Sequence, residues 1–139
     1  MSTIPPRVRS LIESGRLTHL VTINPDGSPQ ASAIWIGLEG DEIVSGHLGE
    51  HRKLVNIRRD PRLVLTLEAG TRTEIGLDEY LVIHGTGRVT DGGAPELLQR
   101  LAHVYLGPDV VFPPMPNPPA GYVLRITPDR FGGVGPWSD

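Results

Sequence analysis

Extended segments follow one another in this chain with few helices between them, and this order limits the possible folds more than any other feature. Six runs combine β-branched or alternating apolar residues with flanking turn residues. They lie at residues 17–23, 30–38, 42–47, 62–69, 79–90 and 122–127. Only short turns join the first three runs, which predicts a three-stranded antiparallel meander. A doubly wound parallel sheet is disfavoured, because it alternates strands with helices.

Three segments with apolar residues at helical spacing interrupt these runs. They lie at residues 5–15, 49–61 and 94–106. Gly85 and Gly87 fall inside a predicted strand and indicate a bulge or a sharp bend, as at a barrel corner. Residues 107–120 carry six prolines and one glycine, which predicts an irregular loop. We therefore predict a mainly β fold, a six-stranded antiparallel barrel with flanking helices, in a single domain spanning residues 1–139.

Composition excludes several classes of function. The chain has 139 residues and no cysteine, so disulfides, thiol catalysis and sulfur-ligated metal centres are ruled out. Its formal net charge of −3 provides no overall basic excess for nucleic-acid binding. No stretch approaches the roughly 18 apolar residues of a membrane span, and the first ten residues lack the apolar run of a secretory signal. We expect a cytoplasmic protein with neither a nucleic-acid nor a membrane partner.

The segment Gly49-Glu50-His51-Arg52-Lys53 places two cations at the predicted start of a helix. Cations are unfavourable there for the helix alone, whereas the unpaired N–H groups and the positive dipole end attract anions. Lys53 is the only lysine among 13 basic residues, and a compact ammonium suits a site that a forked guanidinium does not fit. The pattern favours a phosphate site at Arg52 and Lys53, and the alternative is a solvated basic pair.

The run at 30–38 alternates, which gives it two different faces. One face carries Ile34, Ile36 and Leu38, and the other carries Ala31, Ala33, Trp35 and Gly37. A single indole among small side chains suits a planar ring or a second subunit. The alternative is that Trp35 is an ordinary core residue packed on the first helix.

His47 and His51 lie four residues apart, a spacing that binds zinc when both residues lie on one helix. Here a glycine and a change from strand to helix separate them, and no third ligand follows at a recognisable spacing. We expect no metal site. The GxGxxG motif, the GxSxG motif and a catalytic pair of carboxylates are also absent from the sequence.

The segments LTHLVTINPDGSPQASAIWI, HRKLVNIRRDPRLVLTLE and EYLVIHGTGRVTD together resemble the split-barrel flavin-binding superfamily. That superfamily includes pyridoxamine-phosphate oxidases and deazaflavin-dependent oxidoreductases. The tail RITPDRFGGVGPWSD resembles the branch that uses the deazaflavin coenzyme F420, and the resemblance covers residues 5–136. No arginine follows Arg130, in contrast to the substrate segment that ends the pyridoxamine-phosphate oxidases, so we do not expect a vitamin-phosphate oxidase.

The resemblance implies a homodimer with the cofactor in grooves between the subunits. It also implies that Arg52 and Lys53 hold the cofactor phosphate where the third strand passes into a helix. The other implied contacts are Ser32, Ile34 and Trp35 at the ring, His47 and His51 close to the phosphate, and Asn56 facing the same groove one turn after Arg52.

The activity that the resemblance implies is F420-dependent hydride transfer to an unsaturated small organic substrate. Because such a cofactor carries the chemistry itself, the chain needs no nucleophile or acid–base pair of its own. Two alternatives remain open: an FMN-dependent oxidoreductase, and a non-catalytic protein that binds a flavin. Phe112 and the prolines around it are expected to form part of a substrate wall. Solvent, Tyr105 and Tyr122 are the candidate proton donors.

Overall fold

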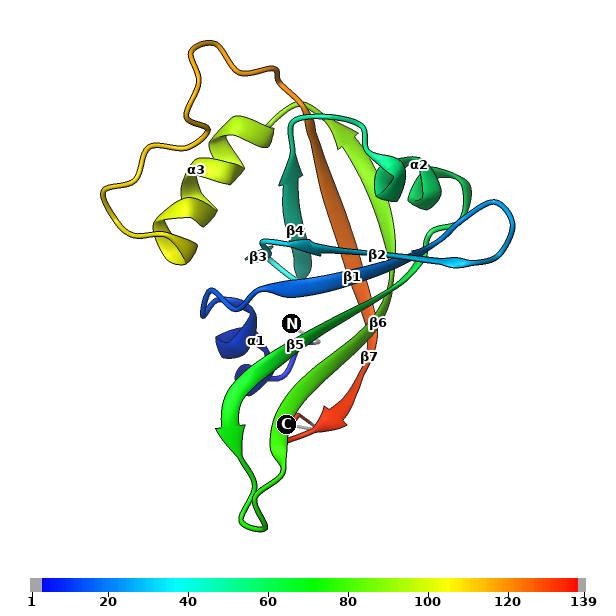
Figure 1. The fold of residues 1–139 in the computed structure, drawn as a ribbon, viewed down its shortest axis with the longest axis vertical. Helices are drawn as coiled ribbons and strands as arrows, with labels where there is room; N and C mark the ends of the chain where they lie inside the picture. The colour runs from blue at the N-terminus through cyan, green and yellow to red at the C-terminus, as the bar shows by residue number, and fades with distance from the viewer. Residues whose placement is uncertain (1–3, 138–139) are drawn as a thin grey trace.

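The computed structural model describes residues 4–137 of the chain (Figure 1). Three helices and seven strands lie within this range. In chain order they are α1 (Pro6–Ile12), β1 (Thr18–Ile23), β2 (Pro29–Ile34), β3 (Gly37–Glu39), β4 (Glu42–His47), α2 (Arg52–Arg59), β5 (Arg62–Arg72), β6 (Asp78–Asp91), α3 (Ala94–Tyr105) and β7 (Tyr122–Val134). Each predicted helix is present, and the strand count rises from the expected six to seven because the predicted strand at 30–38 is divided into β2 and β3.

The seven strands form one antiparallel sheet in the order β2-β1-β5-β6-β7-β4-β3. The two edge strands, β2 and β3, follow each other in the chain with only Trp35 and Ile36 between them. The sheet must therefore roll until its two edges meet at this link. β2 and β3 do not pair with each other, so the barrel remains open. These features confirm the mainly β, antiparallel split barrel.

The predicted three-stranded meander is wrong, because the run at 30–38 does not form one strand. β2 pairs with β1 at one edge of the sheet, and β3 pairs with β4 at the other. The chain breaks where the Trp35 ring turns aside to stack on Tyr105, whose hydroxyl accepts a hydrogen bond from the Ile36 N–H at 3.0 Å. The predicted alternation nevertheless holds, since Ile34, Ile36 and Leu38 are all buried in one core cluster.

The glycines of β6 mark an irregularity in its pairing with β7, as predicted. His84 pairs with Arg130 while Gly85 pairs with Pro128, so Asp129 is the extra residue of a bulge. A Cβ on Gly85 would lie 2.6 Å from the Thr127 carbonyl oxygen, which leaves room only for glycine. A proline is tolerated inside a strand at such a bulge. Accordingly β7 continues to Val134, beyond the predicted end at residue 127.

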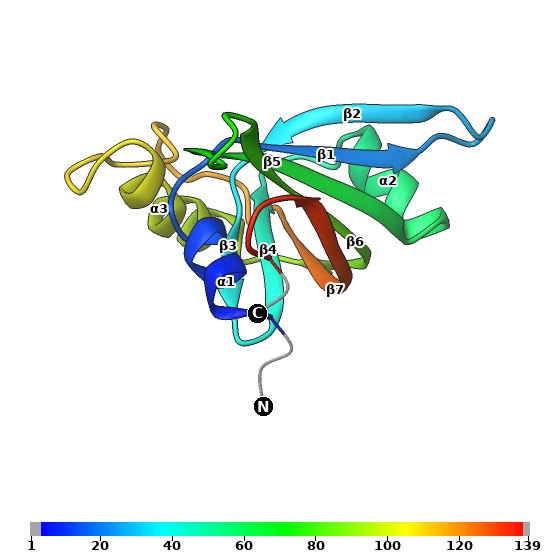
Figure 2. The same ribbon diagram turned by 90° about the horizontal axis from the view of Figure 1, so that it is seen from below.

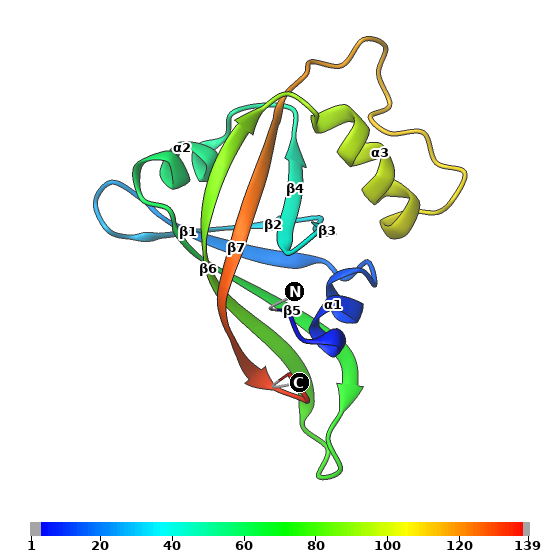
Figure 3. The same cartoon turned by 180° about the vertical axis from the view of Figure 1, so that it is seen from behind.

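The main core lies inside the rolled sheet and is completed by two helices on opposite sides of β1 (Figures 1 and 3). α1 contributes Val8, Leu11 and Ile12, and α2 contributes Leu54 and Ile57. Both sets of residues have the spacing of one helical face. The two helices thereby bury the same apolar interior that the inward side chains of the strands supply.

A second, smaller cluster lies between α3 and the outer face of the sheet. Leu97 and Leu101 of α3 pack with Val44 of β4 and Val123 of β7, and the half-buried Trp35 packs against them. Figure 2 shows α3 on the side of β3 and β4, while α2 lies beside β1. Trp35 is therefore packed on the third helix and not on the first.

Candidate functional site

A cavity of about 220 Å³ lies where the link between β2 and β3, the end of β4, the start of α2 and helix α3 come together. Its lining residues are Leu17, Ala33, Ile34, Trp35, Ser45, Gly46, His47, Lys53, Leu98 and Phe112. Four residues predicted to bind the cofactor, Ile34, Trp35, His47 and Lys53, line this one cavity, which we call the Lys53 pocket.

His47 ends β4 and is buried beside Ser45, the residue two positions earlier on the same face of the strand. The Ser45 hydroxyl lies 2.9 Å from Nε2 of the imidazole. Burial, with a smaller contribution from the charges of Lys53 and His51, lowers the pKa of His47 to about 4. The imidazole is therefore neutral at pH 7 and adds a hydrogen-bonding group to the pocket without a second positive charge.

Lys53 lies in the first turn of α2 and is half-buried, and this burial lowers the pKa of its ammonium group. Among residues 4–137, seven of the twelve arginines pair with carboxylates. By contrast, Lys53 has neither a hydrogen bond nor an ion pair with any residue in the described range 4–137. Burying a charge without a partner is costly. The pocket therefore holds a cation that favours an anionic ligand.

Arg52 and His51 do not line the Lys53 pocket. Both residues are exposed, and Arg52 lies instead at a shallow surface site with Asn24, Pro25 and Asp26 of the turn between β1 and β2. The structure thus separates the side chains of Arg52 and Lys53, although the two residues are adjacent in sequence. Any shared phosphate would have to bridge the pocket and the neighbouring surface.

Asn56 and Ser32 are also outside the pocket lining. Asn56 is fully buried, and its Nδ2 donates to Thr22 Oγ1 at 3.1 Å and to Asn24 Oδ1 at 3.0 Å. Its side chain thus ties α2 to β1 and does not face the groove, contrary to the expectation from the sequence. The Ser32 hydroxyl is enclosed and has no hydrogen-bond partner among the described residues.

Three aromatic rings pack together beside the pocket, and two of them, Trp35 and Phe112, line it. The Trp35 and Tyr105 rings lie 5.2 Å apart between centroids and 16° from parallel. Phe112 lies 5.1 Å from Trp35 at 54°. The Tyr105 hydroxyl donates to the Arg16 carbonyl oxygen at 2.9 Å, and burial raises its pKa. This hydroxyl is therefore part of the packing, and neither Tyr105 nor Tyr122 lines the pocket.

A family model described as "Pyridoxamine 5'-phosphate oxidase" matches residues 4–135. The chain belongs to this family. The resemblance to the split-barrel flavin-binding superfamily is thereby confirmed, and the oxidoreductases of that superfamily are relatives of this chain. Among the curated proteins, none matches this chain.

Solved structures that share the fold of this pyridoxamine 5'-phosphate oxidase family member include the following three proteins, each with a different description. An F420 reductase is 24% identical, with a TM-score of 0.71, over 93% of this chain and 98% of the other. The conserved hypothetical protein Rv2991 from Mycobacterium tuberculosis is 25% identical, with a TM-score of 0.68, over 96% and 84%. An FMN-binding protein from Syntrophomonas wolfei subsp. wolfei is 14% identical, with a TM-score of 0.67, over 91% and 83%.

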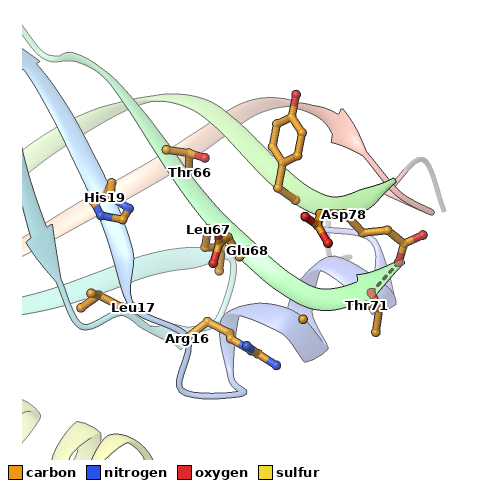
Figure 4. A pocket seen from close by; sticks show the side chains of 11 residues that line it. Arg16, Leu17, His19, Thr66, Leu67, Glu68, Thr71 and Asp78 are labelled. Atoms are coloured by element: carbon orange, nitrogen blue, oxygen red, sulfur yellow. Dashed lines mark hydrogen bonds between the residues drawn. The ribbon is translucent and has the colours of Figure 1, made fainter. Parts of the chain in front are cut away.

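This family member has a second, larger cavity of about 580 Å³ on the outer face of β1, β5 and β6 (Figure 4). None of the predicted site residues lines it, and Leu17 borders both cavities. Three carboxylates line it: Asp78 pairs with Arg72, Glu79 accepts a hydrogen bond from Thr71, and the third is Glu68. The remaining lining residues are Arg16, His19, Thr66, Leu67, Gly70 and Tyr80. The Lys53 pocket is therefore the better candidate for an anionic ligand.

Sequence reasoning missed Ser45, Gly46 and Leu98 as lining residues of the pocket. Ser45 could have been predicted, because residues two apart on a strand share a face and His47 was already a candidate. Gly46 and Leu98 belong together: a Cβ on Gly46 would lie 3.1 Å from Leu98 Cγ. That contact depends on how α3 packs on β4, which the sequence pattern does not specify.

No group of three His, Asp or Glu side chains in the described range is placed to hold a metal ion. None of the helices between residues 4 and 137 has the length and apolar character needed to cross a membrane.

Proposed function

We propose that this protein binds the deazaflavin coenzyme F420 and uses it for hydride transfer to an unsaturated small organic substrate. The observation that carries the proposal is Lys53: a half-buried ammonium group without a counter-charge among the described residues, in a pocket with apolar and aromatic walls. The family membership and the fold shared with an F420 reductase support the same cofactor class.

The residues of the pocket fit a planar ring that carries an anionic group. Lys53 provides the positive charge, and the neutral His47 and Ser45 provide hydrogen-bonding groups. Ile34 and the aromatic wall at Trp35 provide apolar surface against which a ring can stack. When bound, the deazaflavin supplies the hydride, while the chain binds and orients the ring and excludes water.

A homodimer is part of the proposal, because the Lys53 pocket of one chain is small. Its pocket measures about 220 Å³, whereas small-molecule sites usually measure roughly 300–1,000 Å³. The exposed Ala31 and Ala33 of β2 lie opposite Val21 and His19 of β1, and these small side chains allow another chain to approach closely. Sedimentation velocity at micromolar concentration should show a dimer, and a monomer would contradict a shared groove. A cytoplasmic location remains a prediction from the sequence.

Titration of the purified protein with F420 and with FMN tests the cofactor. We expect tight binding of F420, and weakening by roughly 10- to 100-fold in Lys53→Met, the change expected when a charged partner is lost. Arg72→Met is the control, because Arg72 is exposed on the hairpin between β5 and β6 and pairs with Asp78. Unchanged affinity in Lys53→Met would refute the phosphate assignment.

The same titration separates the alternatives. A yellow protein that binds FMN more tightly than F420 would replace the proposed cofactor by FMN. Bound F420 without turnover of any acceptor, when the reduced cofactor is supplied, would support a binding protein in place of an enzyme.

A further inference from the structure

Phe112 reaches the Lys53 pocket from the proline-rich loop between α3 and β7. Its ring is half-buried, lines the pocket and lies 5.1 Å from the ring of Trp35. Val111 on one side is 76% exposed, whereas Pro113 on the other side is buried. The loop thus turns one aromatic side chain inward, and something must hold the backbone in that position.

Gln99 of α3 holds this backbone at two points. Its Nε2 donates to the Val110 carbonyl oxygen at 2.8 Å, and its Oε1 accepts the Phe112 N–H at 3.1 Å. The same Nε2 lies 3.0 Å from Nε2 of His103, one turn further along α3. The Gln99 side chain is therefore hydrogen-bonded to the loop backbone on both sides of Val111.

The loop has little else to fix it between its ends. From residue 111 to residue 119, all within the described chain, the bond from the Phe112 N–H to Gln99 is the one hydrogen bond that the backbone makes. Five of these nine residues are prolines, which have no N–H to donate and restrict the backbone. A stiff segment of this kind keeps its position when it is fastened at one place.

We propose that Phe112 sets the width of the planar aromatic anion that the Lys53 pocket admits, and that Gln99 is the positioning residue that holds Phe112 there. Phe112 acts in the pocket that the proposed function assigns to the cofactor ring and the reacting substrate. Lys53 anchors the anionic group, and the ring shares the cavity of about 220 Å³ with Phe112 and the other lining side chains. Without the phenyl ring, or without the two hydrogen bonds between Gln99 and the loop, the pocket is open to wider ligands.

Two aromatic sulfonates test this without any cofactor. Naphthalene-1-sulfonate and pyrene-1-sulfonate share the anionic group and differ in width, and their binding is followed by fluorescence titration. We expect wild-type protein to prefer the naphthalene by at least roughly tenfold, a usual size discrimination for an apolar pocket. Lys53→Met should weaken both ligands alike. If wild-type protein binds neither sulfonate, or both equally, the proposal is overturned.

The variants separate the two roles. Phe112→Ala should abolish the preference for naphthalene. Gln99→Leu should do the same while exchange of the Phe112 amide with solvent accelerates by about tenfold, as expected when one or two hydrogen bonds are lost. Gln99→Glu keeps an acceptor for the Phe112 N–H but not the donor to Val110, so it should show an intermediate preference if Gln99→Leu folds poorly. His103→Ala is the control and should behave as wild type, because the two bonds to the loop remain.

An unchanged preference in Phe112→Ala would show that Phe112 does not limit the pocket. Faster amide exchange in Gln99→Leu with an unchanged preference would remove the positioning role of Gln99. Failure of F420 and FMN to bind, with the sulfonate results as expected, would refute the proposed function and leave the roles of Phe112 and Gln99 supported.

Discussion

Replacement of Asn56 should cost stability and leave ligand binding intact, and this outcome separates a structural role from a cofactor contact. Asn56 is fully buried and donates two hydrogen bonds, to Thr22 Oγ1 at 3.1 Å and to Asn24 Oδ1 at 3.0 Å. Thr22 is itself buried and donates to Gln30 Oε1 at 3.2 Å. In Asn56→Ala these acceptors lose their donor, and the removed amide leaves a small void between α2 and β1.

The expected size follows from these contacts. A net contribution of about 1 kcal/mol for each lost hydrogen bond, and about 1 kcal/mol more for a buried group left unsatisfied, gives a loss of about 2–4 kcal/mol in the free energy of unfolding. For a chain of this size that corresponds to a fall in Tm of roughly 10 °C. Val55→Ala is the matched control, because Val55 lies on the same helix with 42% of its side chain exposed, and it should change the stability by less than about 0.5 kcal/mol.

Urea unfolding followed by circular dichroism measures the stability, and titration with F420 or FMN measures the binding under conditions where both variants are folded. A loss below about 1 kcal/mol in Asn56→Ala would refute the account of the hydrogen bonds. Unchanged stability together with a tenfold weaker cofactor affinity would restore Asn56 as a ligand contact.

Two further predictions concern the bulge and the buried histidine. Gly85→Ala should destabilise the protein by about 1–3 kcal/mol, because the new Cβ meets the Thr127 carbonyl oxygen. Urea unfolding measures this loss, and Gly132→Ala is the control, because a Cβ on Gly132 meets nothing within 4 Å. Equal losses of stability in the two variants would contradict the steric explanation. The pKa of His47 is about 4 in the folded protein and about 6.5 in the unfolded chain, so the unfolded state binds the proton more readily between these values. The free energy of unfolding should not depend on His47 above pH 6.5, and it should fall by on the order of 3 kcal/mol between pH 6.5 and 4. In His47→Gln the free energy of unfolding should change less over this pH range.

The sequence was sufficient for the elements of the fold but not for the order of the strands. Alternation along β5 and helical spacing along α1 each report the local period, and both segments form as predicted. The break between β2 and β3 gave no such signal, since Ile34 and Ile36 stay on one face across it. It depends on the Tyr105 hydroxyl, which meets the Ile36 N–H from 69 positions along the chain. Contacts at that separation are not encoded in any local pattern.

Some residues of the candidate site could likewise be predicted from local sequence, whereas others could not. His47 and Lys53 were found from local chemistry, and both line the pocket. A phosphate held jointly by Arg52 and Lys53 stays a prediction; Lys53 alone of the two lines this pocket, because successive residues on a helix point about 100° apart. Leu98 and Phe112 come from distant segments, and only the packing of α3 and its following loop brings them to the pocket.

The charge of the pocket is set mainly by packing, and neighbouring charges make a smaller contribution at His47. Burial is the first cause of the lowered pKa of both His47 and Lys53. At the same pocket, Gly46 allows Leu98 of α3 to approach β4, since a Cβ on Gly46 would lie 3.1 Å from Leu98 Cγ. Burial thus keeps His47 neutral and leaves Lys53 as the single cation of the pocket lining. A site built in this way distinguishes ligands by one negative charge and by the width left beside Phe112, which is why substitutions at these two places should change affinity and size preference separately.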